Sequence, residues 1–297
     1  MKFGPSPFNY NFVIDIIAAK GLEALATFSI SKYVHDAATL GYNHFEIGLD
    51  IFQTFPIPIL REELEKLHQI KKELNISYSC HFPFLSLDFS GPNQFIREGS
   101  ISAIIDIYNL LKDIESDIDC FVLHPTGETT TEILHYISDL EIKLFAVEMF
   151  KQNAIHSVNT FIAKTGINLR KLAIENLDFP LKPTLEIIKE TQTRFCLDTA
   201  HLLGDSAENL DVCEVLRDNY DLISEIHLQE YNTNSQDSMS DHAALGTTCK
   251  ITAEFFEVLN SRKFQGPLIF ELEDHEIRES CEYIRKIYPA HQGLPHF

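Results

Sequence analysis

Residues 194–201 read Arg-Phe-Cys-Leu-Asp-Thr-Ala-His, and the fold prediction rests on the pattern in this stretch. A short apolar run ends in an acidic side chain, and a histidine follows three residues later. Short apolar runs of this kind are typical of strands that are buried on both faces. Runs that end in a histidine or a glutamate recur on both sides of this stretch, at Cys80-His81, Leu123-His124, Ile174-Glu175, Ile226-His227 and Phe270-Glu271.

Such runs alternate with segments of helical periodicity from one end of the chain to the other. The eight predicted strands are Lys2–Gly4, His44–Gly48, Ile76–Cys80, Cys120–Leu123, Lys171–Ile174, Arg194–Leu197, Leu222–Ile226 and Leu268–Phe270. The predicted helices are Ile30–Leu40, Arg61–Leu74, Asn93–Ile114, Thr131–Phe161 with a break, Thr184–Glu190, Leu210–Asn219, Ala253–Asn260 and Ile277–Ile287. This alternation predicts an α/β fold, a closed (β/α)8 TIM barrel.

The sequence indicates one domain. No internal repeat and no Gly/Ser linker divides residues 1–297, so we expect a single TIM-barrel domain over the whole range. Residues 1–29 contain the first strand and an apolar stretch, Phe12–Ala19, which favours an extra N-terminal helix. Residues 289–297 are interpreted as a tail.

Composition narrows the classes of partner. The 297 residues include 24 Lys and Arg against 44 Asp and Glu, a net charge of −20 with no basic run, which argues against nucleic acid. No apolar run reaches the roughly 20 residues of a membrane span, and the N-terminus lacks the features of a secretory signal. We therefore expect a cytoplasmic protein with no membrane partner. The six cysteines form no C-x-x-C pair, and we expect reduced thiols that are mostly buried in strands.

The residues behind the strands point to a metal site. In a (β/α)8 barrel the carboxyl ends of all strands meet at one mouth. A single histidine or aspartate after a strand, such as Asp198, is more often a loop residue or a helix cap than a ligand. Here six strands carry such a residue, and Zn²⁺ and Mn²⁺ prefer imidazole nitrogen and carboxylate oxygen. The predicted ligands are His81, His124, Glu175, Asp198, His201, His227, His242 and Glu271. The other histidines, His44 among them, are interpreted as structural or solvated.

Several segments resemble a known family. They are Cys80-His81-Phe82-Pro83, Leu123-His124-Pro125-Thr126-Gly127, Ile174-Glu175-Asn176, Cys196-Leu197-Asp198-Thr199-Ala200-His201, Ile226-His227-Leu228 and Phe270-Glu271. Over residues 40–275 the chain resembles the xylose-isomerase-like TIM barrels, also called the AP endonuclease family 2 superfamily. That superfamily includes zinc-dependent phosphodiester hydrolases related to endonuclease IV, and sugar or sugar-phosphate isomerases and epimerases that use one Mn²⁺, Mg²⁺ or Co²⁺.

The resemblance implies a metal core shared by both branches, on Glu175, Asp198, His227 and Glu271. The endonuclease-like branch holds further zincs with additional ligands, which correspond here to His81, His124, His201 and His242. One aspartate of that branch is replaced by Ser240, with Asp241 beside it. The resemblance therefore favours two metals over three.

Two reaction classes follow from the resemblance. In a phosphoester hydrolase for a small phosphorylated substrate, Glu175 bridges the metals and Glu271 orients the attacking water. In a sugar or sugar-phosphate isomerase or epimerase, one metal polarises the substrate while Glu175 and Glu271 move a proton. The number of ligands favours hydrolysis with Zn²⁺, and Mn²⁺ or Mg²⁺ are the alternatives.

The sequence bears less strongly on three further points: a non-catalytic role, the oligomeric state and the substrate. A non-catalytic barrel that binds a metal or a sugar is disfavoured, because the ligand set is complete. Association into a homo-oligomer is left open, since members of the isomerase branch often associate. The identity of the small-molecule substrate depends on loop side chains whose directions the sequence does not define.

Overall fold

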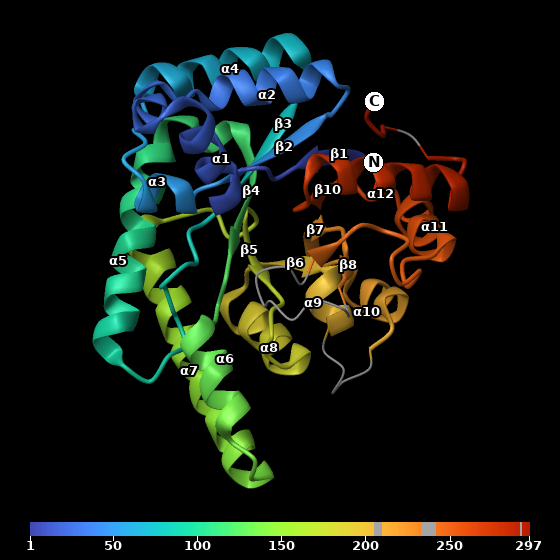
Figure 1. The fold of residues 1–297 in the computed structure, drawn as a ribbon. Coiled ribbons are helices and arrows are strands. Elements are labelled where there is room, and N and C mark those ends of the chain that lie inside the picture. Colours follow the sequence, from blue (N-terminus) through green and yellow to red (C-terminus); the bar gives the residue numbers. More distant parts are fainter. Residues whose placement is uncertain (205–209, 233–241, 292) are drawn as a thin grey trace.

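Eight parallel strands form the central sheet of the molecule, in the order β1-β10-β7-β6-β5-β4-β3-β2, with helices around it (Figure 1). The computed structural model describes residues 1–204, 210–232, 242–291 and 293–297. The strands are β1 Lys2–Pro5, β2 His44–Gly48, β3 Ser77–His81, β4 Ile118–Leu123, β5 Leu172–Glu175, β6 Arg194–Asp198, β7 Ile223–His227 and β10 Pro267–Phe270. All eight predicted strands are found, within one or two residues at each end.

Contacts between the outermost strands of this order, β1 and β2, bring the sheet round into a nearly closed barrel. Phe3 N donates a hydrogen bond of 2.7 Å to Asn43 Oδ1, and Asn43 N donates one of 3.3 Å to Phe3 O. A Cβ atom at position 4 would lie 2.6 Å from His44 O, so only glycine permits this approach of the two backbones. The predicted TIM-barrel fold is confirmed.

Helices follow the strands in the order that the sequence predicts. They are α1 Tyr10–Lys20, α2 Ile30–Thr39, α3 Asp50–Thr54, α4 Arg61–Leu74, α5 Gln94–Leu111, α6 Glu128–Tyr136, α7 Leu140–Thr165, α8 Leu181–Thr191, α9 Thr199–Gly204, α10 Val212–Asn219, α11 Ala253–Ser261 and α12 Asp274–Ile287, with 3-10 helices at Leu22–Thr27 and Lys112–Asp117. Helix α8 begins three residues earlier than predicted, because the first turn of a helix tolerates Pro183.

The predicted break within residues 131–161 separates α6 from α7. Asp139 ends the break as the N-cap of α7, where its Oδ1 accepts a hydrogen bond of 3.0 Å from Ile142 N. Gly166, with a φ of 68°, terminates the same helix. Helices α6 and α7 form a hairpin that extends beyond the barrel (Figure 1).

The N-terminal segment adds a layer to the barrel. Helix α1 and the 3-10 helix that follows it occupy the region in which an extra helix is expected. Phe8 packs edge-to-face against Phe28 and Phe45, with ring centroids 5.3 and 5.4 Å apart. At the other end of the chain, His296 N donates to Leu40 O at 2.9 Å, so the tail lies against the end of α2.

The cysteines are unpaired, and five of the six are buried. Cys80, Cys120 and Cys196 lie in strands, as predicted, whereas Cys213 and Cys281 lie on the inward faces of α10 and α12. Cys249 is exposed. Among the described residues, no helix is long and apolar enough to cross a membrane.

The barrel interior is polar at the amino ends of β2 and β3. We use the name barrel floor for His44 and Ser77, the first residues of these two strands. The His44 ring contacts Ser77 Oγ through Nδ1 at 2.7 Å and Ser79 Oγ through Nε2 at 2.9 Å. Burial lowers the pKa of His44 to about 3, so the ring is neutral at neutral pH.

Candidate metal centre

Strand register brings the predicted ligands together at the carboxyl ends of the strands, which we call the mouth. Asp198 is the register partner of His227, Glu175 pairs with Cys196, and His227 pairs with Ile269, two residues before Glu271. The eight predicted side chains therefore come from six strands and the segments behind them. All eight lie in described residues, and each belongs to at least one group of possible metal ligands.

The first group consists of His81, His124 and Glu175. Glu175 Oε2 lies 3.1 Å from His81 Nε2 and 3.0 Å from His124 Nε2. The Nδ1 of His81 lies 2.8 Å from Phe82 O, and donation to this carbonyl leaves Nε2 directed at the mouth. Phe84, which is 39% exposed, stacks on the His124 ring with centroids 4.6 Å apart.

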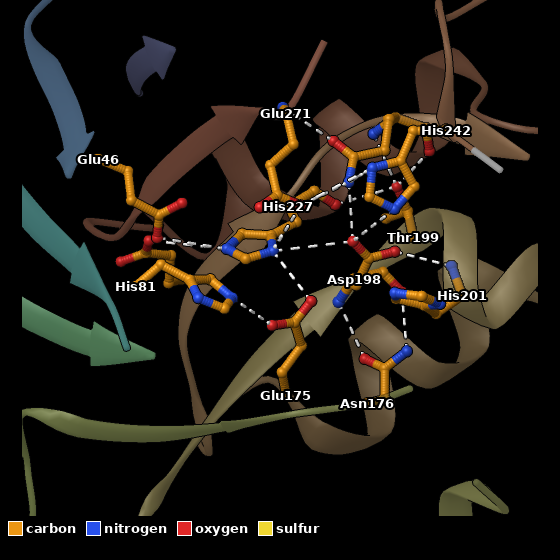
Figure 2. A network of polar contacts seen from close by, with 12 residues as sticks. Glu46, His81, Glu175, Asn176, Asp198, Thr199, His201, His227, His242 and Glu271 are labelled. Atoms are coloured by element: carbon orange, nitrogen blue, oxygen red, sulfur yellow. Dashed lines mark hydrogen bonds and ion pairs between the residues drawn. The ribbon is translucent and has the colours of Figure 1, made fainter. Parts of the chain in front are cut away.

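The central group consists of Glu175, Asp198, His227 and Glu271. Glu175 Oε1 and Glu271 Oε2 each lie 3.1 Å from His227 Nδ1, and Asp198 Oδ2 lies 3.7 Å from the same nitrogen (Figure 2). Three carboxylates thus converge on one nitrogen, which can donate a single proton. Glu175 belongs to both the first and the central group.

The third group consists of Asp198, His201 and His242. His242 Nε2 lies 4.0 Å from Asp198 Oδ2, and the rings of His201 and His242 are 5.5 Å apart. Asp198 also caps the first turn of α9, because its Oδ1 accepts a hydrogen bond of 2.7 Å from His201 N. Ser240 and Asp241, on which the expected number of metals depends, lie outside the described residues.

Two buried amide side chains that the sequence interpretation missed contact these predicted ligands. Asn176 donates to Asp198 O and accepts from Asp198 N, both at 2.9 Å, so its amide extends the pairing of β5 with β6. Gln229 Nε2 donates to Asp198 Oδ2 at 2.8 Å and to Glu271 Oε2 at 3.1 Å. In the sequence these amides could be noticed by their position, because Asn176 directly follows Glu175 and Gln229 lies two residues after His227.

Charges at the mouth depend on one another. Burial alone would raise the pKa of Glu175, but the charges and hydrogen bonds of His227 and His124 hold it well below its usual range. Burial opposes protonation of His81, yet the hydrogen bond and charge of Glu175 raise its pKa to about 10. At His124 burial is the largest cause, and the pKa is lowered. Burial raises the pKa of Asp198 against the charges of its histidine neighbours.

Glu46 and Glu225 lie between the mouth and the barrel floor, and both are completely buried. Burial together with the charge of Glu46 raises the pKa of Glu225 well above its usual value. Burial would also raise the pKa of Glu46, but the charge of His227 lowers it. Neither glutamate ends a predicted strand, so the sequence pattern does not single them out.

The donor set fits a divalent metal ion. Within the first, central and third groups the ligand atoms lie within 4.8 Å of one another, and they are imidazole nitrogens and carboxylate oxygens; Cys196 joins a further group with Glu175 and His227. Burial raises the pKa of the Cys196 thiol well above its usual value, so it is a poor ligand. Nitrogen and oxygen donors of this kind suit Zn²⁺ and Mn²⁺.

The sequence matches the family model of the xylose isomerase-like TIM barrel over residues 34–287. The chain belongs to this family. Members of the xylose isomerase-like TIM barrel family are metal-dependent isomerases, epimerases or endonucleases, and this chain is an enzyme of that kind. No curated protein sequence is significantly similar to it.

Solved structures with the same fold include epimerases and an endonuclease. A D-tagatose 3-epimerase-like protein has a TM-score of 0.65 at 16% identity, with 98% of each chain covered. Endonuclease IV from Thermus thermophilus has a TM-score of 0.63 at 17% identity, with 98% of this chain and 99% of that chain covered. The 3-keto-D-glucoside 4-epimerase YcjR from E. coli has a TM-score of 0.61 at 16% identity, covering 96% and 100%. At these identities the likeness concerns the fold.

Proposed function

We propose that this xylose isomerase-like TIM barrel is a divalent-metal-dependent phosphoester hydrolase for a small phosphorylated substrate. The observation that carries the proposal is the overlap of the three ligand groups. The first and central groups share Glu175, the central and third groups share Asp198, and together they use all eight predicted side chains. A single-metal enzyme needs no more than the central group. Zn²⁺ is the first choice of metal, and Mn²⁺ or Mg²⁺ are the alternatives.

The roles of the chain's own residues follow from their positions. Bound divalent ions would stabilise the attacking and leaving oxygens of an in-line displacement. Glu175 directs Oε2 toward His81 and His124 and Oε1 toward His227, so we assign it the bridging position. The side chain of Glu271 is 22% exposed at the mouth, and we assign it the orientation of the attacking water.

A small substrate is proposed because the molecule is strongly acidic. A net charge of −20 repels the many phosphates of duplex DNA, whereas a single phosphoester needs only local compensation at the mouth. A gel-shift experiment at physiological salt is expected to show no tight binding of duplex DNA. Tight binding that weakens steeply with added salt would contradict the proposed substrate class.

One observation favours the alternative, a sugar or sugar-phosphate isomerase or epimerase. Glu175 Oε1 and Glu271 Oε2 each lie 3.1 Å from His227 Nδ1, one below and one above it in the view of Figure 2. Two carboxylates in this arrangement could remove a proton from one face of a substrate carbon and return one to the other. In that reaction His81 and His124 would contact substrate hydroxyl or phosphate groups.

Metal analysis combined with one substitution separates the two functions. A hydrolase is expected to hold two or more zinc ions per chain and to cleave a chromogenic phosphodiester. His124→Ala should then remove about one equivalent of zinc and lower turnover about 10- to 100-fold. His275→Ala, which changes an exposed histidine on α12, is the matched control. One ion per chain, with turnover of ketoses in Mn²⁺, would replace the hydrolase by the isomerase.

A further inference from the structure

The two ring nitrogens of His227 face different surroundings. Nδ1 points to Glu175, Asp198 and Glu271 at the mouth, whereas Nε2 points into the barrel, where Glu46 Oε2 lies 3.5 Å away (Figure 2). The side chains of both His227 and Glu46 are completely buried. Bulk solvent therefore does not reach the inner side of the ring.

Two glutamates compete for this nitrogen, and their contacts distinguish them. Glu225 Oε1 is 3.9 Å from His227 Nε2 and already accepts a hydrogen bond of 2.8 Å from Ser79 Oγ. Glu46 is closer, and among the described residues neither of its oxygens, nor His227 Nε2, has a formed hydrogen bond. Glu46 is thus the acceptor best placed for the Nε2 proton, after an approach of a few tenths of an ångström.

We propose that Glu46 is a positioning residue for His227: it accepts the Nε2 proton and so directs Nδ1, with its lone pair, to the central group. This inference rests on the proposed metal-dependent function. A histidine that binds a metal through one nitrogen commonly donates its other N–H to a carboxylate, which fixes both the tautomer and the ring orientation.

Strand β2 contributes to the site through Glu46. Strands β3 to β7 and β10 carry the predicted ligands at their carboxyl ends, whereas β2 carries none. Glu46 lies in the middle of β2, one layer below the mouth, and reaches the site through the inward nitrogen of His227. A residue in this position shapes the site without touching a substrate.

Zinc affinity, measured by competition with a chromogenic chelator, tests the role directly. Glu46→Leu removes the acceptor and should weaken binding at the tightest site about 10- to 100-fold. Glu46→Gln keeps the volume and one acceptor oxygen, and it should weaken binding by less. Glu63→Gln is the matched control, because it changes a buried glutamate on α4 that contacts Ser31 and Lys66 and not the mouth.

A second readout separates positioning from structural damage. In zinc-loaded protein labelled with ¹⁵N-histidine, the His227 ring should carry its proton on Nε2, and His227→Asn identifies its signals. Unchanged zinc affinity in both Glu46 variants would overturn the positioning role alone, as would a proton on Nδ1. A wild-type chain that binds none of Zn²⁺, Mn²⁺ and Mg²⁺ would instead overturn the proposed function. If Glu46→Leu does not fold, the proton position on His227 in zinc-loaded wild type decides, since a proton on Nδ1 again rejects the role.

Discussion

Buried histidines at the two ends of the barrel interior behave in opposite ways. His44 on the barrel floor and His81 at the mouth come from neighbouring strands, and both are almost completely buried. The pKa of His44 is lowered to about 3, whereas that of His81 is raised to about 10. The difference lies in their partners, because His44 contacts two serine hydroxyls and His81 contacts the carboxylate of Glu175.

One residue type therefore has two uses inside one barrel. Burial disfavours the charged ring at both ends, so on the floor the histidine is a neutral hydrogen-bonding filler. At the mouth a carboxylate reverses the effect of burial, and the imidazole becomes part of a set of compensating charges. Removing charges from the mouth should therefore affect metal binding and turnover, whereas protonating His44 on the barrel floor should affect the stability of the fold.

The largest effect is expected from removing the carboxylate that the first and central groups share. Glu175→Gln should lower phosphodiester turnover by on the order of 10³-fold, equivalent to about 4 kcal/mol. The zinc content should fall below one equivalent, because His81, His124 and His227 lose their common partner. Steady-state kinetics and metal analysis provide the measurement, with Glu63→Gln as the control. Retention of full zinc content would show that the mouth does not depend on this carboxylate.

Removal of metal should destabilise the mouth and leave the floor unaffected. A ligand present at about 100 times its Kd stabilises the folded state by about 2.7 kcal/mol, so a chelator should lower the melting temperature by several degrees. The same treatment should have little effect on Glu175→Gln. An equal shift in both proteins, measured by calorimetry, would mean that the chelator acts elsewhere.

Acid should destabilise the folded protein through His44 on the barrel floor. The unfolded chain binds a proton at His44 with a pKa near 6.5, whereas the folded chain does so only near 3. Between these values the unfolded state holds more protons at this residue, so the contribution of His44 to stability falls as the pH falls, by about 2 kcal/mol between pH 7 and pH 5. Urea unfolding at the two pH values measures the loss. His44→Gln should be less stable at pH 7 but should lack this part of the slope, and His275→Gln should retain it.

The smallest effect is expected within the mouth itself, in the third group. His242 is more exposed than His81, with 22% of its side chain accessible against 5%, and it lies 3.9 Å from an oxygen of Glu271 and 4.0 Å from an oxygen of Asp198. His242→Ala should therefore lower turnover about tenfold, equivalent to about 1.4 kcal/mol. A comparison of its turnover with that of His124→Ala would show whether the first or the third group contributes more to the reaction. A larger loss at His242 would place the reaction on that side of the mouth.

The positions of the strands and of the eight predicted ligands could be read from the sequence, because an apolar run and the polar residue that ends it are both visible there. Parallel strands then bring such residues to one end without further information. Asn176 and Gln229 escaped notice, since an amide after a strand has no signature until its hydrogen bonds are known. Glu46 could not be predicted for a different reason, because its contact with His227 depends on which strand faces the inner side of that ring.

The cysteine distribution has a practical consequence for spectroscopy. Five thiols are buried, and Cys249 alone is exposed, in the turn that Glu230 holds through hydrogen bonds to Thr248 N, Cys249 N and Ile251 N. Glu230 belongs to β8, Glu230–Tyr231, which pairs with β9, His242–Ala243. A maleimide fluorophore should therefore attach once per folded chain without any engineered cysteine, and it would report on the segment that carries His242.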